Sequence, residues 1–426
     1  MNRSQTEGRE GALLVGLDLG TTKTACLVAE ATEDGSLSVI GVGRAANTGL
    51  RRGVVVNIEA TVESIQRAVA EAERMAGVKI SSAYVSVGGD HIKGLTSHGV
   101  IAVSRKDHEI VQDDVDRVLE AAKAVPIPQD REIIHVLTQE YLIDNQDGIK
   151  EPVGMSGVRM EAVVHVVTGA ATSVQNVLKS CQRAGVQVRD LVLQPLASAE
   201  AVLSPDEREL GVCLLDIGGG TTDLLVVWEG SVRYTGVVPV GGLACTRDIA
   251  VGLATPNDEA EQLKRAYGSA QVSRVAEGEL IEVAGVGGRQ AKQVERQLLA
   301  KVLQPRMEEI FQMALNQLKS SGFHARLAGG LVLTGGGALM PGACELAEEI
   351  IGRPARLGKP QGLKGLTDVV QGPDYSTAVG LVRHGLKGGA EGGAVSARGT
   401  DGPGGPAPVR GPGMIDSFKK LFKDYF

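Results

Sequence analysis

Two stretches of this chain, about two hundred residues apart, repeat one local pattern. Residues 13–29 read LLVGLDLGTTKTACLVA, and residues 211–227 read GVCLLDIGGGTTDLLVV. Each has an apolar run typical of a β-strand, an aspartate, a glycine turn with two threonines, and a second apolar run. The turn therefore joins two strands, whereas a Rossmann or Walker loop joins a strand to a helix. This duplication predicts two related halves that face one another.

The rest of the chain is typical of several packed units built from strands and helices. Its 426 residues exceed one ordinary hydrophobic core. Strand-like and helical runs alternate from residue 12 to about residue 385, which predicts an α/β fold. Residues 1–11 are polar, and we expect them to be disordered.

The two repeated turns carry the groups that a polyphosphate requires. Glycines let backbone N–H groups approach an anion closely, while threonine hydroxyls and the Lys23 ammonium add donors and positive charge. A carboxylate repels phosphate, so Asp18 and Asp216 predict a hydrated Mg²⁺ between the two. The predicted contacts to the phosphates are Gly20, Thr21, Thr22, Lys23, Gly218, Gly219, Gly220, Thr221 and Thr222.

A third glycine-rich segment follows at residues 330–342 (GLVLTGGGALMPG). It reads as a short apolar strand, three glycines, and a helix that begins near Pro341. Because glycine has no side chain, a ribose or a flat ring can lie against the backbone there. The predicted contacts to a nucleoside are Gly335, Gly336, Gly337 and Leu339.

Two weaker pairs complete the predicted nucleotide site. Glu261 and Lys264 lie three residues apart on a predicted helix, so they share one face and can reach ribose hydroxyls or an adenine edge. An ordinary surface ion pair is the alternative. Gly241 and Gly242 follow an apolar run and either approach a phosphate or form a simple turn.

The C-terminal residues 414–426 (MIDSFKKLFKDYF) divide completely into two faces on a helix. They follow residues 387–413, which have almost nothing apolar to bury and are predicted to be a flexible linker. The helix would rise only about 20 Å, too little to span a bilayer. We expect it to lie on an acidic membrane; docking to a partner protein or to its own domain are the alternatives. The predicted membrane contacts are Met414, Ile415, Phe418, Lys419, Lys420, Leu421, Phe422, Lys423, Tyr425 and Phe426.

The overall composition argues against several other classes of protein. The net charge of −7 argues against nucleic acid as a general partner. The five cysteines form no CxxC pair and look like reduced core residues, and the seven scattered histidines suggest no metal cage. No apolar run is long enough for a transmembrane helix.

Several of these segments resemble a known superfamily. Residues 18–22, 216–222 and 333–338 resemble the phosphate-one, phosphate-two and adenosine motifs of the actin and sugar-kinase superfamily. Residues 194–200 (QPLASAE) are similar to its first connecting helix. Within this group the chain looks closest to the FtsA family of bacterial cell-division proteins. The supporting stretches are residues 49–61 (GLRRGVVVNIEAT), 85–103 (VSVGGDHIKGLTSHGVIAV), 210–223 and the terminal helix.

The resemblance implies an actin-like, two-lobed ATPase fold with ATP and Mg²⁺ in its cleft. The implied parts are residues 12–84 and 162–207 with about 375–386 for the first lobe, 85–161 for an inserted family-specific subdomain, 208–251 and 324–374 for the core of the second lobe, 252–323 for its small subdomain, 387–413 for the linker, and 414–426 for the membrane helix.

The resemblance also implies partners. FtsA-like proteins polymerise as actin-like protofilaments, bind acidic lipids through the C-terminal helix, and hold the C-terminal tail of the tubulin-like FtsZ in the small subdomain. Arg306 is the expected anchor for that acidic peptide, although an exposed helix arginine is the alternative. The implied function is to tether the FtsZ ring to the cytoplasmic face of the cell membrane at the division site. Later membrane proteins of the divisome are further expected partners.

The residues beside the predicted cation site also bear on catalysis. Asp18, Asp216 and Gln194 are the candidate catalytic residues, but chaperone ATPases of the superfamily have a glutamate where this chain has Gln194. An amide can orient water but cannot accept its proton, so we expect slow or negligible turnover.

Other members of the superfamily fit the chain less well. The runner-up is a PilM-like scaffold of pilus assembly, which does not explain the tail helix. A chaperone would need a substrate-binding domain, and a sugar kinase would need a substrate base in the cleft. The insertion disfavours an MreB-like filament.

Overall fold

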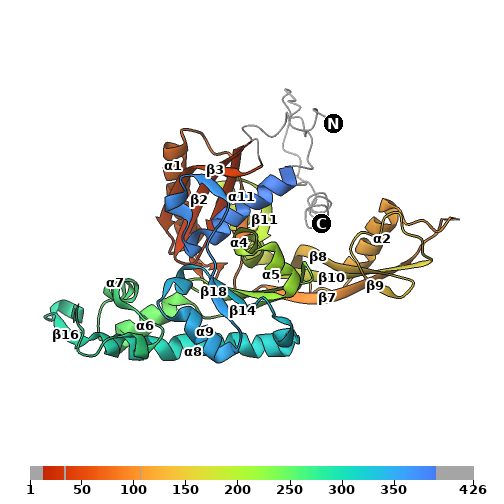
Figure 1. Ribbon diagram of the computed structural model, residues 1–426. Coiled ribbons are helices and arrows are strands. Elements are labelled where there is room, and N and C mark those ends of the chain that lie inside the picture. The colour runs from red at the N-terminus through yellow and green to blue at the C-terminus, as the bar shows by residue number, and fades with distance from the viewer. Residues whose placement is uncertain (1–12, 33–34, 106, 390–426) are drawn as a thin grey trace, which may run out of the picture.

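The computed structural model describes residues 13–32, 35–105 and 107–389. The predicted tail helix and nearly all of the predicted linker lie outside these residues. The described chain forms two lobes and an elongated inserted module, which lies at the right of Figure 1. No helix within the described ranges is both long enough and apolar enough to cross a membrane.

Lobe 1 is a six-stranded sheet with helices on both faces. The strand order is β11-β6-β1-β2-β3-β19. Helices α1 and α3 cover one face, and α4 and α11 cover the other, so alternate residues of β1 enter two different cores. The elements are β1 (Leu13–Leu19), β2 (Lys23–Ala31), β3 (Leu37–Ala46), α1 (Ile58–Ala76), β6 (Ser82–Val87), α3 (Ala171–Arg183), β11 (Gln187–Leu193), α4 (Gln194–Val202), β19 (Leu363–Gly365), α10 (Thr367–Val370) and α11 (Ser376–Gly389), with the small hairpin β4 (Leu50–Arg51) and β5 (Val54–Val55).

Lobe 2 repeats the central pattern of lobe 1. Its strand order is β14-β13-β12-β17-β18. In each lobe the aspartate strand pairs antiparallel with the strand after the glycine turn and parallel with a strand on its other side. The predicted duplication is therefore confirmed. The elements are α5 (Pro205–Leu210), β12 (Val212–Ile217), β13 (Thr222–Trp228), β14 (Ser231–Val238), α6 (Gly242–Gly252), α7 (Asn257–Tyr267), β15 (Leu280–Val283), β16 (Lys292–Glu295), α8 (Arg296–Ser321), β17 (Leu331–Thr334), α9 (Ala343–Ile351) and β18 (Ala355–Leu357).

The inserted module, called the insert below, is a four-stranded sheet with one helix on it. Its strand order is β7-β10-β8-β9, and α2 packs on the sheet around a core of its own. The elements are β7 (Lys93–Ala102), α2 (Gln112–Lys123), β8 (Arg131–Ile143), β9 (Gln146–Ile149) and β10 (Arg159–Ala170). Its bounds differ from the predicted 85–161, because β6 runs to Val87 in the lobe 1 sheet and β10 runs to Ala170. The predicted bounds thus began inside β6 and ended inside β10.

The chain crosses between the lobes at two places, after the buried helix α4 and before the partly exposed strand β19. Helix α4 is buried from Pro195 to Val202 and packs against α11. A Cβ at Gly380 of α11 would lie 1.7 Å from the Ala197 carbonyl oxygen, so the two helix backbones touch. The return to lobe 1 comes earlier than the predicted residue 375, because β19 already pairs with β3. Helix α11 also extends to Gly389, inside the range predicted as linker.

Candidate functional site

A cavity of about 450 Å³ separates the two lobes where their glycine turns meet. The following predicted residues line it: Asp18, Gly20, Thr21, Thr22, Lys23, Gln194, Asp216, Gly218, Gly219, Gly220, Thr221, Gly242, Glu261, Lys264, Gly335, Gly336, Gly337 and Leu339. The structure thus brings together residues from opposite ends of the chain. The sequence pattern had placed them in one site.

Two predicted residues do not line this cavity. Thr222 is fully buried at the start of β13, and its hydroxyl donates to the Val240 carbonyl oxygen at 2.9 Å. Gly241 packs behind the second turn, where a Cβ would lie 2.5 Å from the Gly218 carbonyl oxygen. Both residues shape the turn from behind and do not contact the cavity, contrary to the prediction.

The two glycine turns close in the same way and face each other. Gly20 N–H donates to the Lys23 carbonyl at 2.9 Å, and Gly218 N–H donates to the Thr221 carbonyl at 2.9 Å. A Cβ at Gly219 would lie 2.5 Å from the Thr22 methyl carbon, and one at Gly220 would lie 2.7 Å from Thr21 Oγ1. Any side chain on these glycines would therefore force the turns apart.

Two aspartates lie in the cavity wall, one from each lobe. Asp18 Oδ1 accepts from Ser86 Oγ at 2.9 Å, and Asp216 Oδ2 accepts from Ser198 Oγ at 2.6 Å. Burial raises the pKa of Asp18 against the opposing effect of Lys23, and it raises the pKa of Asp216 to about 6. The two carboxyl groups also disfavour each other's ionisation, so a cation between them would be stabilised.

Sequence reasoning missed a third carboxyl group, Asp223. It is 4% exposed, it lines the same cavity, and burial together with Asp216 raises its pKa well above the usual value. Its position after two threonines within an apolar strand was the available signal. Among the described residues, no group of three or more His, Cys, Asp or Glu side chains is close enough to hold a metal directly. The donor set fits a hydrated divalent cation whose remaining ligands come from a bound phosphate.

Lys23 is engaged with two residues that the sequence did not single out. Its ammonium donates to the Asp374 carboxylate at 3.0 Å and to the Asp374 backbone carbonyl, and it lies 4.4 Å from the centre of the Tyr375 ring. Arg44 Nη1 is 3.5 Å from the same carboxylate. Arg44 and Asp374 both line the cavity. Asp374 is distant in sequence from both cations, so no local pattern could reveal this group.

Glu261 and Lys264 form a compact polar group on the lobe 2 side. Lys264 Nζ donates to Glu261 Oε2 at 2.6 Å and to Thr246 Oγ1 at 2.8 Å. Their side chains are 29% and 14% exposed, and both line the cavity. The pair therefore lies at the cavity, and its contact with a nucleoside stays a prediction.

The three-glycine segment lies directly against the second turn. A Cβ at Gly335 would lie 2.4 Å from Asp216 Oδ1, and one at Gly337 would lie 2.3 Å from the Ile217 side chain. Gly335 also has a φ of 81°, which favours glycine. Leu339, Met307 and Met340 add apolar surface to the same cavity. This end of the cavity can therefore hold a flat apolar ring beside polar groups.

Gln194 lies at the start of α4, beside the first aspartate. Its Nε2 donates to the Leu19 carbonyl at 3.2 Å, to Ser86 Oγ at 3.3 Å and to Asp18 Oδ1 at 3.4 Å. The Gln194 amide therefore holds the Asp18 carboxylate in place. Because an amide does not accept a proton from water, Gln194 can orient Asp18 but cannot act as a base.

Arg306 does not line the main cavity. It borders a smaller hollow of about 250 Å³ and is already paired, with its Nε 2.6 Å from Asp248 Oδ2 and its Nη1 bonded to Glu309. A carboxylate from a partner would have to displace or share one of these contacts. Its role as a peptide anchor stays a prediction.

Comparisons with known proteins place this geometry in context. A family model described as "Cell division protein FtsA" matches residues 213–380, and one described as "SHS2 domain inserted in FTSA" matches residues 89–168. A Pseudomonas aeruginosa protein described as "Cell division protein FtsA" is 50% identical over 392 residues, which cover 92% of this chain and 94% of that protein. The Escherichia coli K12 protein of the same description is 43% identical, over 88% of this chain and 90% of its own length.

Solved structures share the fold at lower identity. A PilM-PilN type IV pilus biogenesis complex has a TM-score of 0.62 at 18% identity, covering 88% of this chain and 98% of that chain. MreB5 of Spiroplasma citri bound to ADP has a TM-score of 0.50 at 14% identity, covering 87% and 95%. At these identities the likeness shows the fold alone, and it confirms the predicted actin-like architecture.

The raised pKa of Asp216 makes stability depend on pH. The folded-state pKa of about 6 exceeds the ordinary 3.8, so ionisation destabilises the fold as pH rises from about 4 through about 6. We expect Asp216→Asn to be more stable than the native chain at pH 7.5, by at most about 3 kcal/mol, and to lose most of that advantage at pH 4.5. Urea unfolding of the nucleotide-free protein measures both differences.

Asp147→Asn, on exposed β9, removes the same charge and serves as the control. A gain of stability that is equal at the two pH values would contradict the assignment.

Proposed function

The chain belongs to the FtsA family of cell-division proteins, and we propose that it tethers the FtsZ ring to the cytoplasmic membrane. In this proposal it binds ATP with Mg²⁺ between its lobes and polymerises as actin-like protofilaments at the cytoplasmic face of the membrane. The observation that carries the nucleotide part is the pair of facing glycine turns around one cavity with buried carboxyl groups from both lobes.

The cleft offers suitable residues for the phosphates, the ribose and the base of a nucleotide. The N–H groups and hydroxyls of the turns suit phosphate oxygens, and Asp18 and Asp216 suit the water shell of Mg²⁺. Glu261 and Lys264 suit ribose hydroxyls, while the three-glycine segment and the neighbouring methionines suit the adenine ring. Mg²⁺ would neutralise the phosphates and the carboxylates at once.

Turnover of this nucleotide should be slow. Gln194 holds Asp18 by a hydrogen bond and has no basic atom with which to activate water. We therefore propose that ATP acts mainly by changing the conformation of the protein when it binds. Rapid phosphate release by the purified protein without FtsZ would contradict this assignment.

The relatives favour division over pilus assembly. Proteins described as "Cell division protein FtsA" are 40–50% identical over most of this chain, whereas the PilM-PilN complex is 18% identical. The second candidate function, a scaffold of pilus assembly, therefore has only the shared fold in its favour.

The FtsZ tail is proposed to bind the small subdomain at residues 252–323, with Arg306 as an anchor. Arg306 is 28% exposed in its side chain and lies on α8 beside Asp248 and Glu309. Arg306→Glu should weaken binding of a synthetic FtsZ tail peptide at least tenfold in a fluorescence titration, because the new carboxylate would repel the acidic peptide. Unchanged affinity would remove Arg306 from the proposed site.

Nucleotide binding must draw Lys23 away from Asp374. The carboxylate 3.0 Å from Lys23 competes with phosphate oxygens for the same ammonium, and its charge also repels the triphosphate. Asp374→Asn is therefore expected to tighten Mg²⁺-ATP binding several-fold, as measured by calorimetric titration.

Asp368→Asn, on the exposed side of α10, loses the same charge outside the cavity and should bind like the native chain. Weaker binding by Asp374→Asn would show that Asp374 instead positions Lys23 for the nucleotide.

The membrane part of the proposal depends on residues 414–426, outside the described residues. One short amphipathic helix binds a membrane weakly, whereas many helices joined in one filament bind at high effective concentration. With acidic liposomes, the intact chain should sediment, more so with Mg²⁺-ATP, and a chain ending at residue 413 should stay in solution. If both chains sediment alike, or neither does, the tail is not the membrane anchor.

A further inference from the structure

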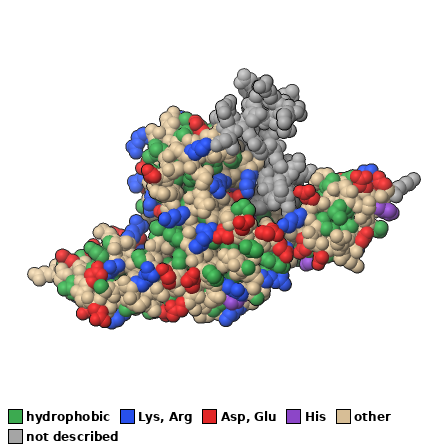
Figure 2. Space-filling model, in the orientation of Figure 1, with side chains coloured by type: hydrophobic (Ala, Val, Ile, Leu, Met, Phe, Trp, Pro, Cys, Tyr) green, Lys and Arg blue, Asp and Glu red, His purple; other side chains and the backbone are tan. Residues whose placement is uncertain are grey.

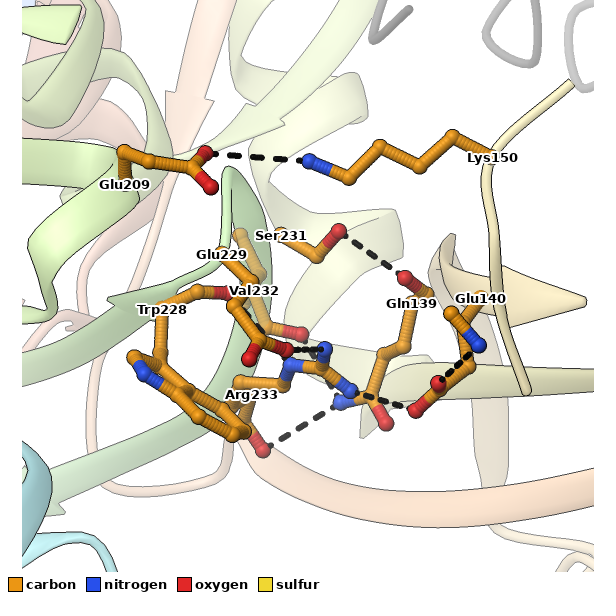
Figure 3. A network of polar contacts seen from close by, with 10 residues as sticks. Gln139, Glu140, Lys150, Glu209, Trp228, Glu229, Ser231, Val232 and Arg233 are labelled. Atoms are coloured by element: carbon orange, nitrogen blue, oxygen red, sulfur yellow. Dashed lines mark hydrogen bonds and ion pairs between the residues drawn. The ribbon is translucent and has the colours of Figure 1, made fainter.

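The insert belongs to lobe 1 in sequence but packs along lobe 2. It leaves the lobe 1 sheet after β6 and returns to it at α3, yet its strands β7, β8 and β10 contact β14, the edge strand of lobe 2. An edge strand presents unpaired backbone groups, and the insert covers them. Figure 3 shows this contact from close by.

Hydrogen bonds join the insert to the backbone and side chains of β14. Gln139 Nε2 donates to the Val232 carbonyl oxygen at 2.8 Å, and Ser231 Oγ donates to the Gln139 carbonyl oxygen at 2.9 Å (Figure 3). Farther along the strand, His165 Nε2 and Thr235 Oγ1 are 2.8 Å apart. All these side chains are at most 6% exposed, so water does not compete for the bonds.

An ion pair lies at the centre of the contact. Arg233 of β14 bonds Glu140 of the insert at 2.9 Å and Glu229 of its own hairpin at 3.0 Å (Figure 3). Its guanidinium carbon is 5.2 Å from the centre of the Trp228 ring. Arg233 is 9% exposed, so loss of Glu140 would leave this nearly buried charge with Glu229 as its one carboxylate partner among the described residues. The insert is thus fixed to lobe 2 by contacts that resist sliding.

The other end of the insert lies close to the nucleotide cleft. Leu193 N–H donates to His135 Nε2 of β8 at 2.9 Å, and the next residue is Gln194, which bonds Asp18.

The loop before β7 forms a second connection, since Asp90 N–H donates to the Arg52 carbonyl at 3.3 Å. Gly53, next to Arg52, donates its N–H to Thr21 Oγ1 at 3.1 Å. Both connections reach the first phosphate turn through very few residues.

Strand β14 leads to the second phosphate turn. It ends at Val238, and shortly afterwards Gly242 and Leu243 donate their N–H groups to the Gly218 and Gly219 carbonyls at 2.9 and 2.8 Å. The insert therefore contacts the supports of both turns, one through each lobe. A ligand that changes the separation of the turns must also move or strain the insert.

We infer that the insert is coupled to the nucleotide cleft through the Arg233–Glu140 contact and the Leu193–His135 contact, so that each site changes the affinity of the other. The inference rests on the proposed nucleotide binding. Coupling free energy is reciprocal, so a partner that docks on the insert would alter nucleotide affinity by the same factor by which nucleotide alters docking. The insert has surface available for a partner: Val100, Val153 and Val158 are 47–56% exposed, and Figure 2 shows apolar side chains gathered on it.

Hydrogen exchange of the full chain, read by mass spectrometry with and without Mg²⁺-ATP, tests this coupling. The key variant is Glu140→Gln with Arg233→Gln, which neutralises both partners across the contact; Glu229 loses Arg233 but is 46% exposed and can be hydrated. In the native chain, nucleotide should slow exchange in β8 and β10 as well as in the glycine turns. In the double variant, the response of the turns should persist while the response of the insert falls at least twofold.

Two further variants separate coupling from loss of structure. Ser231→Ala removes one hydroxyl and should give a smaller fall in the same direction. Glu63→Gln with Arg67→Gln neutralises an exposed pair on α1 and should leave both responses unchanged. A native insert that does not respond although the turns do would overturn the inference and leave nucleotide binding intact. An undiminished insert response in the double variant would also overturn it. If a separate calorimetric titration finds no nucleotide binding, both proposals fail.

Discussion

The close approach of two glycine turns, each preceded by a buried aspartate, is the constraint on which the whole structure depends. Asp18 and Asp216 line one cavity between the lobes, and the glycines of the second turn pack against the threonines of the first. Carboxyl groups in such a place tolerate ionisation only beside compensating cations. Two separate sheets, each with an aspartate at the end of a central strand, provide this arrangement. The rest of each lobe supports its own strand from both faces.

Local sequence patterns predicted much of this site, and their failures have physical reasons. The two hairpins and the triple glycine were predicted because the residues that define each of them are adjacent in the sequence. Thr222 was misassigned because the pattern cannot show which way the first side chain of a strand points. Asp374 and Arg44 were missed because their meeting with Lys23 depends on the whole fold. The predicted bounds of the insert fell inside β6 and inside β10, because the local pattern does not show how far each strand extends.

Domain boundaries along the sequence do not describe how this molecule holds together. The insert is carried by lobe 1 but covers the open edge of the lobe 2 sheet, and β19 returns to lobe 1 from a region counted with lobe 2. Helix α4 and helix α11 touch backbone to backbone between the two sheets. Because α4 and α11 pack together between the two sheets, a change in one lobe displaces elements that contact the other. Such a fold can transmit a change at the proposed nucleotide site to surfaces far from it.

A pull on the proposed membrane helix would reach the described part of the chain at helix α11. It is the last described element before the chain continues toward the proposed membrane helix, so tension on a bound tail acts on it first. Its backbone lies directly on β1, where a Cβ at Gly16 would approach the Ala378 carbonyl oxygen to 2.7 Å. That strand ends at Leu19, one residue past Asp18. If the proposed membrane helix holds the chain, a pull on it would reach the wall of the nucleotide cleft through α11 and β1.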